Sequence, residues 1–274
     1  MKDPGMTKKA LEGVVVLDLT NVLSGPFATL HLALLGAEVI KVENPTDGDL
    51  ARKLGNVPKL NKELMGTSFL AQNANKKSLT LNLKKPEAKE IFKRLAATAD
   101  VVVENFRPGV MKRLGVGWET LREINPRLVY CAISGFGQDG PDADKPAYDQ
   151  IIQGLSGEMD VNGDERLHPL RAGFPVCDTV GGMNAAFAIL AALYHRERTG
   201  EGQSIDVALL DSIMPLMGWV SANLLIGGQA PVAIGNDNFT AAPSGTFRTK
   251  DGFVNIAANK QEQWESVCDV LGVP

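Results

Sequence analysis

The sequence predicts an α/β protein with a doubly wound, Rossmann-like parallel sheet and the beginning of a smaller α+β domain. Apolar runs of strand length alternate with helix-length segments from Gly13 onward. Cap residues and prolines mark where helices begin. Beyond residue 225 the signals become shorter and more strand-like. We therefore expect a large domain over residues 1–225 and the start of a small domain over residues 226–274.

The first elements are a strand, a turn, a helix and a second strand. Residues 14–19 (VVVLDL) form a continuous apolar run that predicts the first strand. Residues 24–26 (SGP) supply a cap, a flexible residue and a proline suited to the first turn of a helix, which ends at Gly36. The second strand is expected at residues 39–42, and a right-handed crossover joins the two strands.

The same alternation continues to residue 133. Residues 78–83 (SLTLNL) alternate as a half-buried strand does, and residues 86–98 begin with proline and carry apolar side chains at helical spacing. Further strands are expected at residues 101–103 and 128–133. These elements complete the predicted sheet.

Two long helices and several short elements are expected next. Gly181, Gly182 and the alanines through Ala192 predict a small-residue helix that packs closely on a neighbour. A second long helix is expected from Leu209 to the glycine turn at residues 227–228. The small domain is expected to begin with strands at residues 245–248 and 253–257 and a helix from Gln261.

Composition and charge exclude several functions. With 274 residues, of which 44% are hydrophobic and 22% charged, the chain can bury a full core. The net charge of −4 argues against a nucleic-acid partner. The apolar runs are short or interrupted by polar residues, so we expect buried helices and no membrane partner. Scattered histidines and cysteines predict no metal site, and the lack of a signal-peptide pattern predicts a cytoplasmic location.

The segment VVVENFRPGVMKRLG, residues 101–115, indicates a ligand site. A buried strand ends at Asn105 and Phe106, and Arg107 and Arg113 follow as a helix begins. Open α/β sheets bind ligands at such strand ends, because unpaired N–H groups and the helix dipole gather there. The basic residues suit a phosphate, while Asn105 and Phe106 offer an amide and an apolar face. A solvated basic helix after an ordinary core strand is the alternative interpretation.

A nicotinamide dinucleotide site is not predicted. Such enzymes carry G-x-G-x-x-G after the first strand, where the glycines admit a pyrophosphate. This chain has N-V-L-S-G-P at residues 21–26, and it has no P-loop. The expected sheet is therefore Rossmann-like without the dinucleotide fingerprint.

Seven segments, in order along nearly the whole chain, carry a more specific pattern. They are GVVVLDLTNVLSGP from Gly13, GAEVIKVE from Gly36, NANKKSLTLNL from Asn73, VVVENFRPGVMKRLG from Val101, NPRLVY from Asn125, AYDQIIQGLSG from Ala147 and YHRERTGEGQ from Tyr194. With these segments the chain resembles the class III CoA-transferases, the family of formyl-CoA transferase and of the carnitine and bile-acid CoA-transferases.

The resemblance implies an enzyme that moves CoA from an acyl-CoA donor to a small carboxylic acid acceptor. Coenzyme A would be a substrate, with no permanently bound cofactor, and two chains would form an interlocked homodimer. A dicarboxylate acceptor is expected, because residues 235–248 are shorter than the glycine-rich loop of formyl-type relatives. Relatives of this kind are longer, so the small domain is expected to be truncated. A CoA-binding chain without catalysis is therefore an alternative.

The resemblance also implies how CoA is held. Lys76, Lys77, Lys84 and Arg113 would lie near the nucleotide and Leu81 near the adenine, while Asn105 and Phe106 would border the pantetheine and the thioester. The N–H groups of Val22, Leu23 and Ser24 would stabilise negative charge developing on the thioester oxygen. Leu23 departs from the formyl-CoA relative, which has a glutamine there, so that side-chain amide is lost.

The resemblance further implies a carboxylate nucleophile that forms first a mixed anhydride and then a thioester with CoA. The expected loop is NGDER, residues 162–166, and the ungapped match places Arg166 at the nucleophile's position. Glu165 and Asp164 are the carboxylates within reach, and Glu165 is preferred. Asp149 and Asp178 are the remaining alternatives.

An α-methylacyl-CoA racemase is the alternative enzyme, since it belongs to the same superfamily and abstracts a proton with a His-Asp pair. Here Tyr148 stands in place of that histidine, although Asp178 matches the aspartate. A phenol with a pKa of about 10 is a poor base at neutral pH, so a transferase is favoured. Exchange of an α-proton in deuterated water without an acceptor acid would indicate the racemase.

Overall fold

The computed structural model describes residues 8–273, which divide into two compact units. The described part of the first unit comprises residues 8–152 and 175–216, and that of the second comprises residues 153–174 and 217–273. The second unit thus includes two segments, residues 153–174 and 217–225, that lie inside the predicted large domain, residues 1–225.

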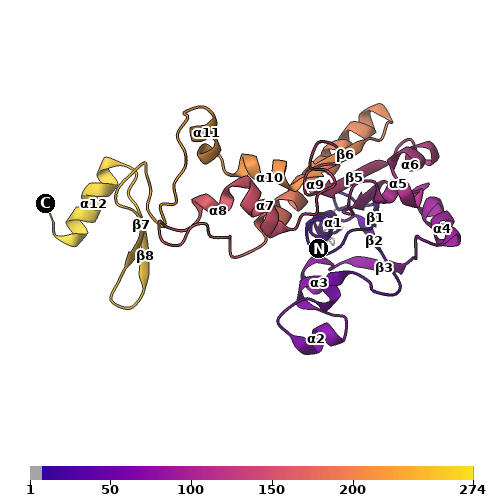
Figure 1. The fold of residues 1–274 in the computed structure, drawn as a ribbon, viewed down its shortest axis with the longest axis horizontal. Coiled ribbons are helices and arrows are strands. Elements are labelled where there is room, and N and C mark those ends of the chain that lie inside the picture. The colour runs from indigo at the N-terminus through magenta and orange to yellow at the C-terminus, as the bar shows by residue number, and fades with distance from the viewer. Residues whose placement is uncertain (1–7, 274) are drawn as a thin grey trace, which may run out of the picture. The chain divides into compact units, whose positions relative to one another are not determined.

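A six-stranded parallel sheet forms the centre of the first unit, with the strand order β3-β2-β1-β4-β5-β6 (Figure 1). This order confirms the doubly wound α/β fold. The chain leaves β1 in one direction and β4 in the other, and ligands of such sheets bind at that switch point. The strands are β1 (Val15–Asp18), β2 (Glu38–Glu43), β3 (Lys76–Thr80), β4 (Val101–Glu104), β5 (Val129–Ser134) and β6 (Ser204–Ala208).

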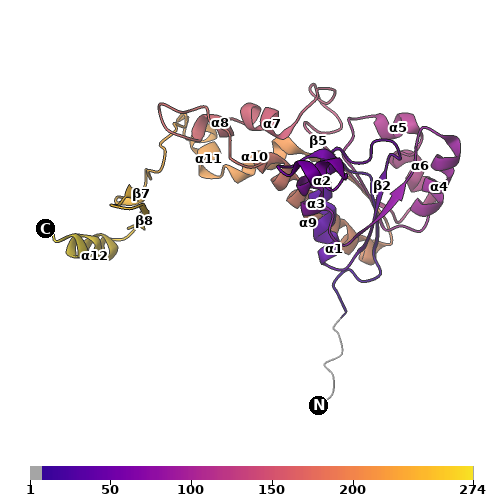
Figure 2. The same cartoon turned by 90° about the horizontal axis from the view of Figure 1, so that it is seen from below.

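Helices cover both faces of the sheet, with α4, α5 and α6 on one face and α1 and α9 on the other (Figure 2). The helices and the 3₁₀ segment of this unit are α1 (Ser24–Leu34), η1 (Leu50–Lys53), α2 (Pro58–Lys62), α3 (Thr67–Gln72), α4 (Pro86–Ala96), α5 (Val110–Leu114), α6 (Trp118–Ile124), α9 (Val176–Thr199) and α10 (Leu209–Leu216), and α7 (Asp149–Ser156) begins in it.

Strand β1 shows how alternate residues separate the two layers. Leu17 and Leu19 pack in one buried cluster with Phe92 of α4 and Leu121 of α6. Asp18 points to the opposite face, where its carboxylate accepts a hydrogen bond from the hydroxyl of Thr29 in α1 at 2.7 Å. This alternation follows from the period of two in a strand. It places a buried carboxylate beneath the start of α1.

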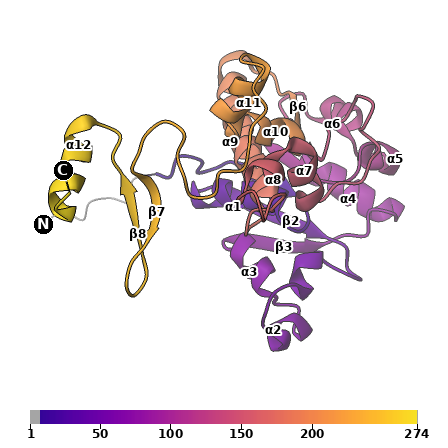
Figure 3. The ribbon, with the colours of Figure 1, turned by 60° about the vertical axis from the view of Figure 1, so that its left-hand side comes forward.

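The second unit contains the predicted strands and helix near the end of the chain. Strands β7 and β8 pair antiparallel, with Ser244 opposite Ala257, and α12 follows them (Figure 3). This hairpin confirms the strand signals at residues 245–248 and 253–257. The elements are α8 (Glu158–Val161), α11 (Trp219–Leu225), β7 (Ser244–Arg248), β8 (Phe253–Ala257) and α12 (Gln261–Leu271).

Two of the predicted elements have different bounds in the structure. The strand predicted at residues 78–83 is β3, which ends at Thr80, because its partner β2 ends opposite it at Glu43. The long helix predicted from Leu209 is two helices, α10 and α11. The break lies at Gly218, whose φ of 52° is incompatible with a right-handed helix.

Helix α9 is long and apolar enough to cross a membrane, judged by length and composition only. In the structure it packs along α1, β5, β6 and α10, and Ala185, Ile189 and Ala192 are buried. A Cβ atom built on Gly182 would lie 2.4 Å from the carbonyl oxygen of Ser24. The predicted close packing of this small-residue helix is therefore confirmed, and its neighbour is the start of α1.

We expect Gly182→Ala to lower the free energy of unfolding by about 1–3 kcal/mol, because the added methyl group must push α9 away from the backbone of α1. Gly154→Ala in α7 is the matched control, since its Cβ would meet only the Met159 sulfur, at 3.8 Å. That control should be neutral or stabilising by up to about 1 kcal/mol. Urea unfolding measures both, and equal stabilities of the two variants would contradict the packing.

Candidate functional site

A cavity lies at the carboxyl ends of β1, β4 and β5, where the strand order reverses. The loop after β1 contributes one wall and the loop after β4 contributes another. Tyr148 and Asp178 line the same cavity. Of the predicted CoA-binding residues, this cavity brings together Val22, Leu23, Asn105 and Phe106.

A second cavity lies at the carboxyl ends of β1, β2 and β3 and contains Leu81 and Lys84 in its lining. Asn21 and Phe106 line both cavities, so the two adjoin. The second cavity thus extends the first and adds apolar side chains and the exposed ammonium group of Lys84. The structure places Leu81, Lys84 and Phe106 together, as their predicted roles in CoA binding require. Those roles remain predictions.

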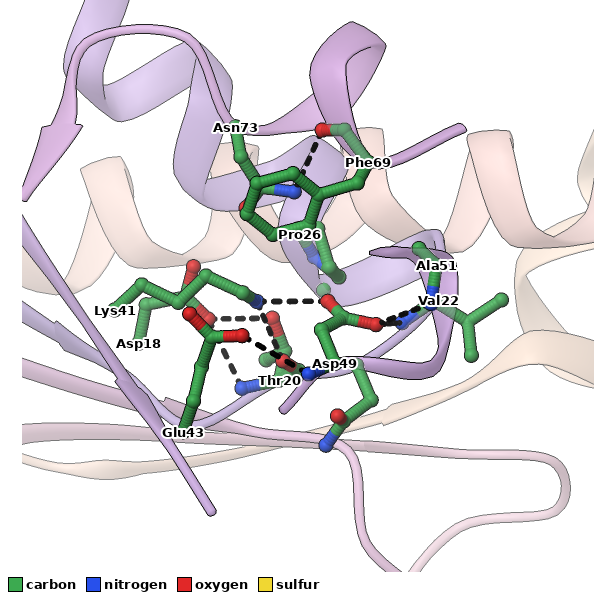
Figure 4. A network of polar contacts seen from close by, with 12 residues as sticks. Asp18, Thr20, Val22, Pro26, Lys41, Glu43, Asp49, Ala51, Phe69 and Asn73 are labelled. Atoms are coloured by element: carbon green, nitrogen blue, oxygen red, sulfur yellow. Dashed lines mark hydrogen bonds and ion pairs between the residues drawn. The ribbon is translucent and has the colours of Figure 1, made fainter. Parts of the chain in front are cut away.

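The loop after β1 is fixed by two side chains from elsewhere in the chain. The N–H of Asn21 donates to Oδ1 of Asn105 at 2.8 Å, and Nδ2 of Asn105 donates back to the carbonyl oxygen of Asn21 at 2.8 Å. The N–H of Val22 donates to Oδ1 of Asp49 at 2.9 Å (Figure 4). Asn105 thus shapes the cavity wall by holding this loop.

The structure disfavours the predicted role of Val22, because its N–H already donates to Asp49. Binding of a thioester oxygen by this N–H group remains a prediction. The N–H groups of Leu23 and Ser24 have no protein acceptor within residues 8–273, and both residues line the cavity. If the loop stabilises a developing oxyanion as predicted, the N–H groups of Leu23 and Ser24 are the donors for it.

Lys76 lies in a buried ion pair. Its ammonium is 3.0 Å from Oδ2 of Asp18, the side chain is 2% exposed, and it donates to the carbonyl of Pro26, the hydroxyl of Thr29 and Oδ1 of Asn73. These partners saturate the ammonium and argue for a structural role. Binding of the nucleotide by Lys76 remains a prediction that this geometry disfavours.

Arg113 and Lys84 differ from Lys76 in their exposure. Arg113 is exposed on α5 and Lys84 is exposed in the loop after β3, where it lines the second cavity. Within residues 8–273 neither side chain forms an ion pair with an acid. Both cations are therefore available to a phosphate group.

Asp178 is the carboxylate in the wall of the first cavity. It lies in the first turn of α9, and burial, reinforced by the negative charge of Asp149, raises its pKa to about 7. Asp149 accepts hydrogen bonds from the N–H of Cys177 at 2.8 Å and from that of Asp178 at 3.1 Å. Asp149 therefore caps the start of α9, while Asp178 lines the first cavity.

The close packing of α9 on α1 explains how Asp178 reaches this place. Asp178 and Gly182 are four residues apart and thus lie on one side of the helix. Gly182 touches the Ser24 carbonyl, so the side of α9 that carries Asp178 faces the loop with Leu23 and Ser24. The signal available in the sequence was an acid one turn before two consecutive glycines.

The predicted nucleophiles Glu165 and Asp164 lie in the second unit, in a turn after α8. Glu165 is exposed. Asp164 accepts hydrogen bonds from the N–H groups of Arg166 at 3.0 Å and Leu167 at 3.1 Å, and these bonds with the Arg166 side chain hold its pKa below the ordinary value. Asp164 therefore stabilises its own turn. The nucleophilic role of either residue remains a prediction.

Glu104 is a buried residue next to the site that sequence reasoning missed. It ends β4, is 4% exposed, and accepts hydrogen bonds from the N–H of Phe106 at 2.8 Å and the hydroxyl of Tyr130 at 3.1 Å. Burial raises its pKa to about 7. The sequence feature that could have indicated it is an acidic residue directly after the three β-branched residues 101–103 of a buried strand. Glu104 orients Phe106, which borders both cavities.

We expect the stability difference between Glu104→Gln and the wild type to depend on pH. A carboxyl pKa raised from 4.5 to about 7 favours the fold below pH 4.5, and this contribution is lost as pH rises toward 7. The loss is on the order of 3 kcal/mol. Glutamine does not titrate, so the variant should gain on the wild type as pH rises. Denaturant unfolding from pH 4.5 to 8 measures this, and a constant difference would refute it.

Comparison with known proteins decides the family. The family model described as CoA-transferase family III matches residues 11–274. The chain belongs to CoA-transferase family III. Succinyl-CoA:glutarate CoA-transferase of Mus musculus is 44% identical over 266 residues, covering 97% of this chain and 60% of the mouse protein. Acetyl-CoA:oxalate CoA-transferase of Acetobacter aceti is 42% identical over 272 residues, covering 99% of this chain and 69% of the relative. The resemblance seen in the sequence is confirmed.

Solved structures agree with this family assignment. A CAIB/BAIF family protein from Brucella suis has a TM-score of 0.88 at 37% identity, over 97% of this chain and 71% of that one. Protein Rv3272 of Mycobacterium tuberculosis has a TM-score of 0.84 at 38% identity, over 97% of this chain and 70% of that one. The family III chain thus shares their fold. It spans about 60% of the length of the mouse relative.

Proposed function

We propose that the protein containing this family III chain transfers CoA from an acyl-CoA to a carboxylic acid. The proposal is supported by the lining of the first cavity, which includes the Asp178 carboxylate and also Leu23 and Ser24, whose N–H groups have no protein acceptor within residues 8–273. Acyl transfer needs a nucleophile and donors for the developing oxyanion, and this wall supplies both.

Asp178 is the nucleophile in this proposal. Its carboxylate oxygen attacks the thioester carbonyl carbon, the C–S bond breaks, and CoA leaves as a thiolate while a mixed anhydride forms. The thiolate attacks the aspartyl carbonyl, which releases the donor acid and leaves an enzyme–CoA thioester. The acceptor carboxylate displaces CoA in the same way, and the thiolate then attacks the acceptor's acyl carbon, which regenerates Asp178 and gives the new acyl-CoA.

The adjoining cavities suit the two ends of acyl-CoA. The adenine nucleotide would lie in the second cavity beside Leu81, with the exposed ammonium of Lys84 near its phosphates. The pantetheine would pass Phe106, which borders both cavities, and bring the thioester to Asp178. Arg113, exposed on α5, would add charge for a phosphate.

A dicarboxylate is the proposed acceptor. Relatives are named for succinate and glutarate in Agrobacterium fabrum and for succinyl-CoA and mesaconate in Haloarcula marismortui. Arg107 and Lys145 line the first cavity, and Lys145 pairs with Asp142 at 2.7 Å. The second carboxylate of such an acceptor would form an ion pair with Arg107 or Lys145. We also propose that the protein forms a homodimer and is located in the cytoplasm.

Mass spectrometry of reaction mixtures tests this function. The full-length protein is incubated with each of several acyl-CoA donors and each of several acids, including succinate, glutarate, acetate and oxalate. We expect a new acyl-CoA and equimolar free donor acid, with dicarboxylates favoured as acceptors. Thioester hydrolysis alone, or deuterium exchange at the α-carbon without an acceptor, would contradict transfer.

A further inference from the structure

The loop after β1 contains a strained residue at the cavity. Val22 has a φ of 68°, in the left-handed region that disfavours a side chain branched at Cβ. Such a conformation persists only where the surroundings enforce it. Val22 lines the cavity directly before Leu23 and Ser24, whose N–H groups have no acceptor in the described part of the chain, residues 8–273. The conformation of Val22 therefore sets where these two N–H groups lie.

Asp49 is the buried group that holds Val22. Its side chain is fully buried, and its Oδ1 accepts the N–H of Val22 and the N–H of Ala51, both at 2.9 Å (Figure 4). It does not line the cavity. Its side chain therefore acts on the first cavity through Val22 and the loop.

Asp49 is fixed in turn by charged partners. Its Oδ2 is 2.9 Å from the ammonium of Lys41, which also donates to the carbonyl of Thr20 at 2.8 Å, at the start of the loop. The N–H of Asp49 donates to Oε2 of Glu43 at 2.9 Å, and both carboxylate oxygens of Glu43 accept hydrogen bonds from Arg52 at 2.7 Å. The anchor of Val22 thus has little freedom to move.

We propose that Asp49 is a positioning residue for acyl transfer, which holds Val22 in its left-handed conformation so that the Leu23 and Ser24 N–H groups face the reacting thioester. This proposal rests on the proposed function. It predicts that losing the Asp49 side chain impairs the chemical step more than CoA binding. Val22, Leu23 and Ser24 line the first cavity and not the second, and Asp49 contacts Glu43 of the second cavity through its backbone N–H, which a substitution keeps.

Two substitutions separate positioning from mere stability. Asp49→Ala removes the acceptor of the Val22 N–H, whereas Asp49→Asn keeps an oxygen acceptor and loses the charge facing Lys41. Val22→Gly removes the steric penalty of the left-handed conformation, so the loop needs less support from Asp49. Phe92→Leu is the control for a loss of stability, since Phe92 is a fully buried core side chain of α4 and lines neither cavity.

Steady-state kinetics of the full-length protein test the proposal, with rates expressed per folded molecule. We expect Asp49→Ala to lower kcat about 10²-fold and to change the KM for acyl-CoA by less than about threefold. Asp49→Asn should lose less, and Val22→Gly added to Asp49→Ala should restore part of kcat. Phe92→Leu should keep the wild-type kcat. An unchanged kcat in Asp49→Ala, or a loss that Val22→Gly leaves untouched, overturns the proposal.

Hydrogen exchange provides a readout that does not depend on activity. Asp49→Ala should speed exchange in a peptide covering residues 20–24 and leave a peptide from β5 unchanged, and Val22→Gly should reverse part of the change. Unchanged exchange at residues 20–24 overturns the positioning role. A wild-type protein that transfers no CoA but shows the expected exchange would instead refute the proposed function.

Discussion

Asp178→Asn is expected to lower kcat by at least about 10³-fold while the protein still binds CoA. The asparagine side chain has nearly the same shape, so the cavity wall persists, but its amide cannot form the mixed anhydride. Removing a carboxyl group whose pKa is raised to about 7 should also leave the fold as stable as before or more stable near pH 8. Steady-state kinetics, with calorimetry of CoA binding, measure both properties.

Asp164→Asn and Glu165→Gln are the controls for this prediction, since both lie in the turn predicted to hold the nucleophile. Transfer by Asp178 predicts wild-type rates for both. A carboxylate nucleophile with a pKa of about 7 also predicts that kcat/KM rises with pH through neutrality and then levels off. Full activity of Asp178→Asn together with inactive Glu165→Gln would restore the original prediction.

Lys76→Met is expected to lower the free energy of unfolding by about 3–5 kcal/mol, because it leaves the buried carboxylate of Asp18 without one of its cations. Burial alone would raise the pKa of Asp18, but the charges of Lys41 and Lys76 and the hydrogen bonds from Thr20 and Thr29 outweigh it and bring the pKa down to about 2. The neighbouring Lys77→Met is the matched control. Lys77 pairs with Glu38 at 2.6 Å, but its side chain is 68% exposed, so the loss should stay within about 1 kcal/mol.

Denaturant unfolding compares the two lysine variants, and CoA titration of the folded proteins distinguishes the two roles of Lys76. A structural role predicts that Lys76→Met loses stability but binds CoA as the wild type does once it is folded. Direct contact with the nucleotide predicts weaker CoA binding at unchanged stability. Equal stability of Lys76→Met and Lys77→Met would contradict the buried ion pair.

The sheet was predictable because each central strand is an apolar run that local sequence reveals. Elements defined by their partners were harder to find. Strand β6 mixes polar and apolar residues and forms along β5, so it gave no separate signal, and the end of β3 depends on where β2 ends. The break at Gly218 requires backbone geometry that the apolar pattern of the helix conceals.

The lining of the first cavity was predictable where a motif places residues at a strand end, as for Asn105 and Phe106. Roles set by distant contacts were not. Lys76 is a surface-like lysine in sequence, and its ion-pair partner Asp18 is 58 residues away. The place of Asp178 depends on how closely Gly182 lets α9 approach α1. The sequence register of one loop therefore indicated Glu165 or Asp164 as the nucleophile, whereas the packing of α9 on α1 indicates Asp178.

Trapping the enzyme–CoA thioester tests the central claim most directly. The full-length protein is mixed with acyl-CoA, treated with borohydride or hydroxylamine, and digested with trypsin. The tryptic peptide 172–196 contains Asp178 as its only acidic residue, whereas the peptide 128–166 contains Asp164 and Glu165. We predict that the modification lies in the peptide 172–196 and disappears in Asp178→Asn. A modification in the peptide 128–166, or none in an active enzyme, would contradict the account.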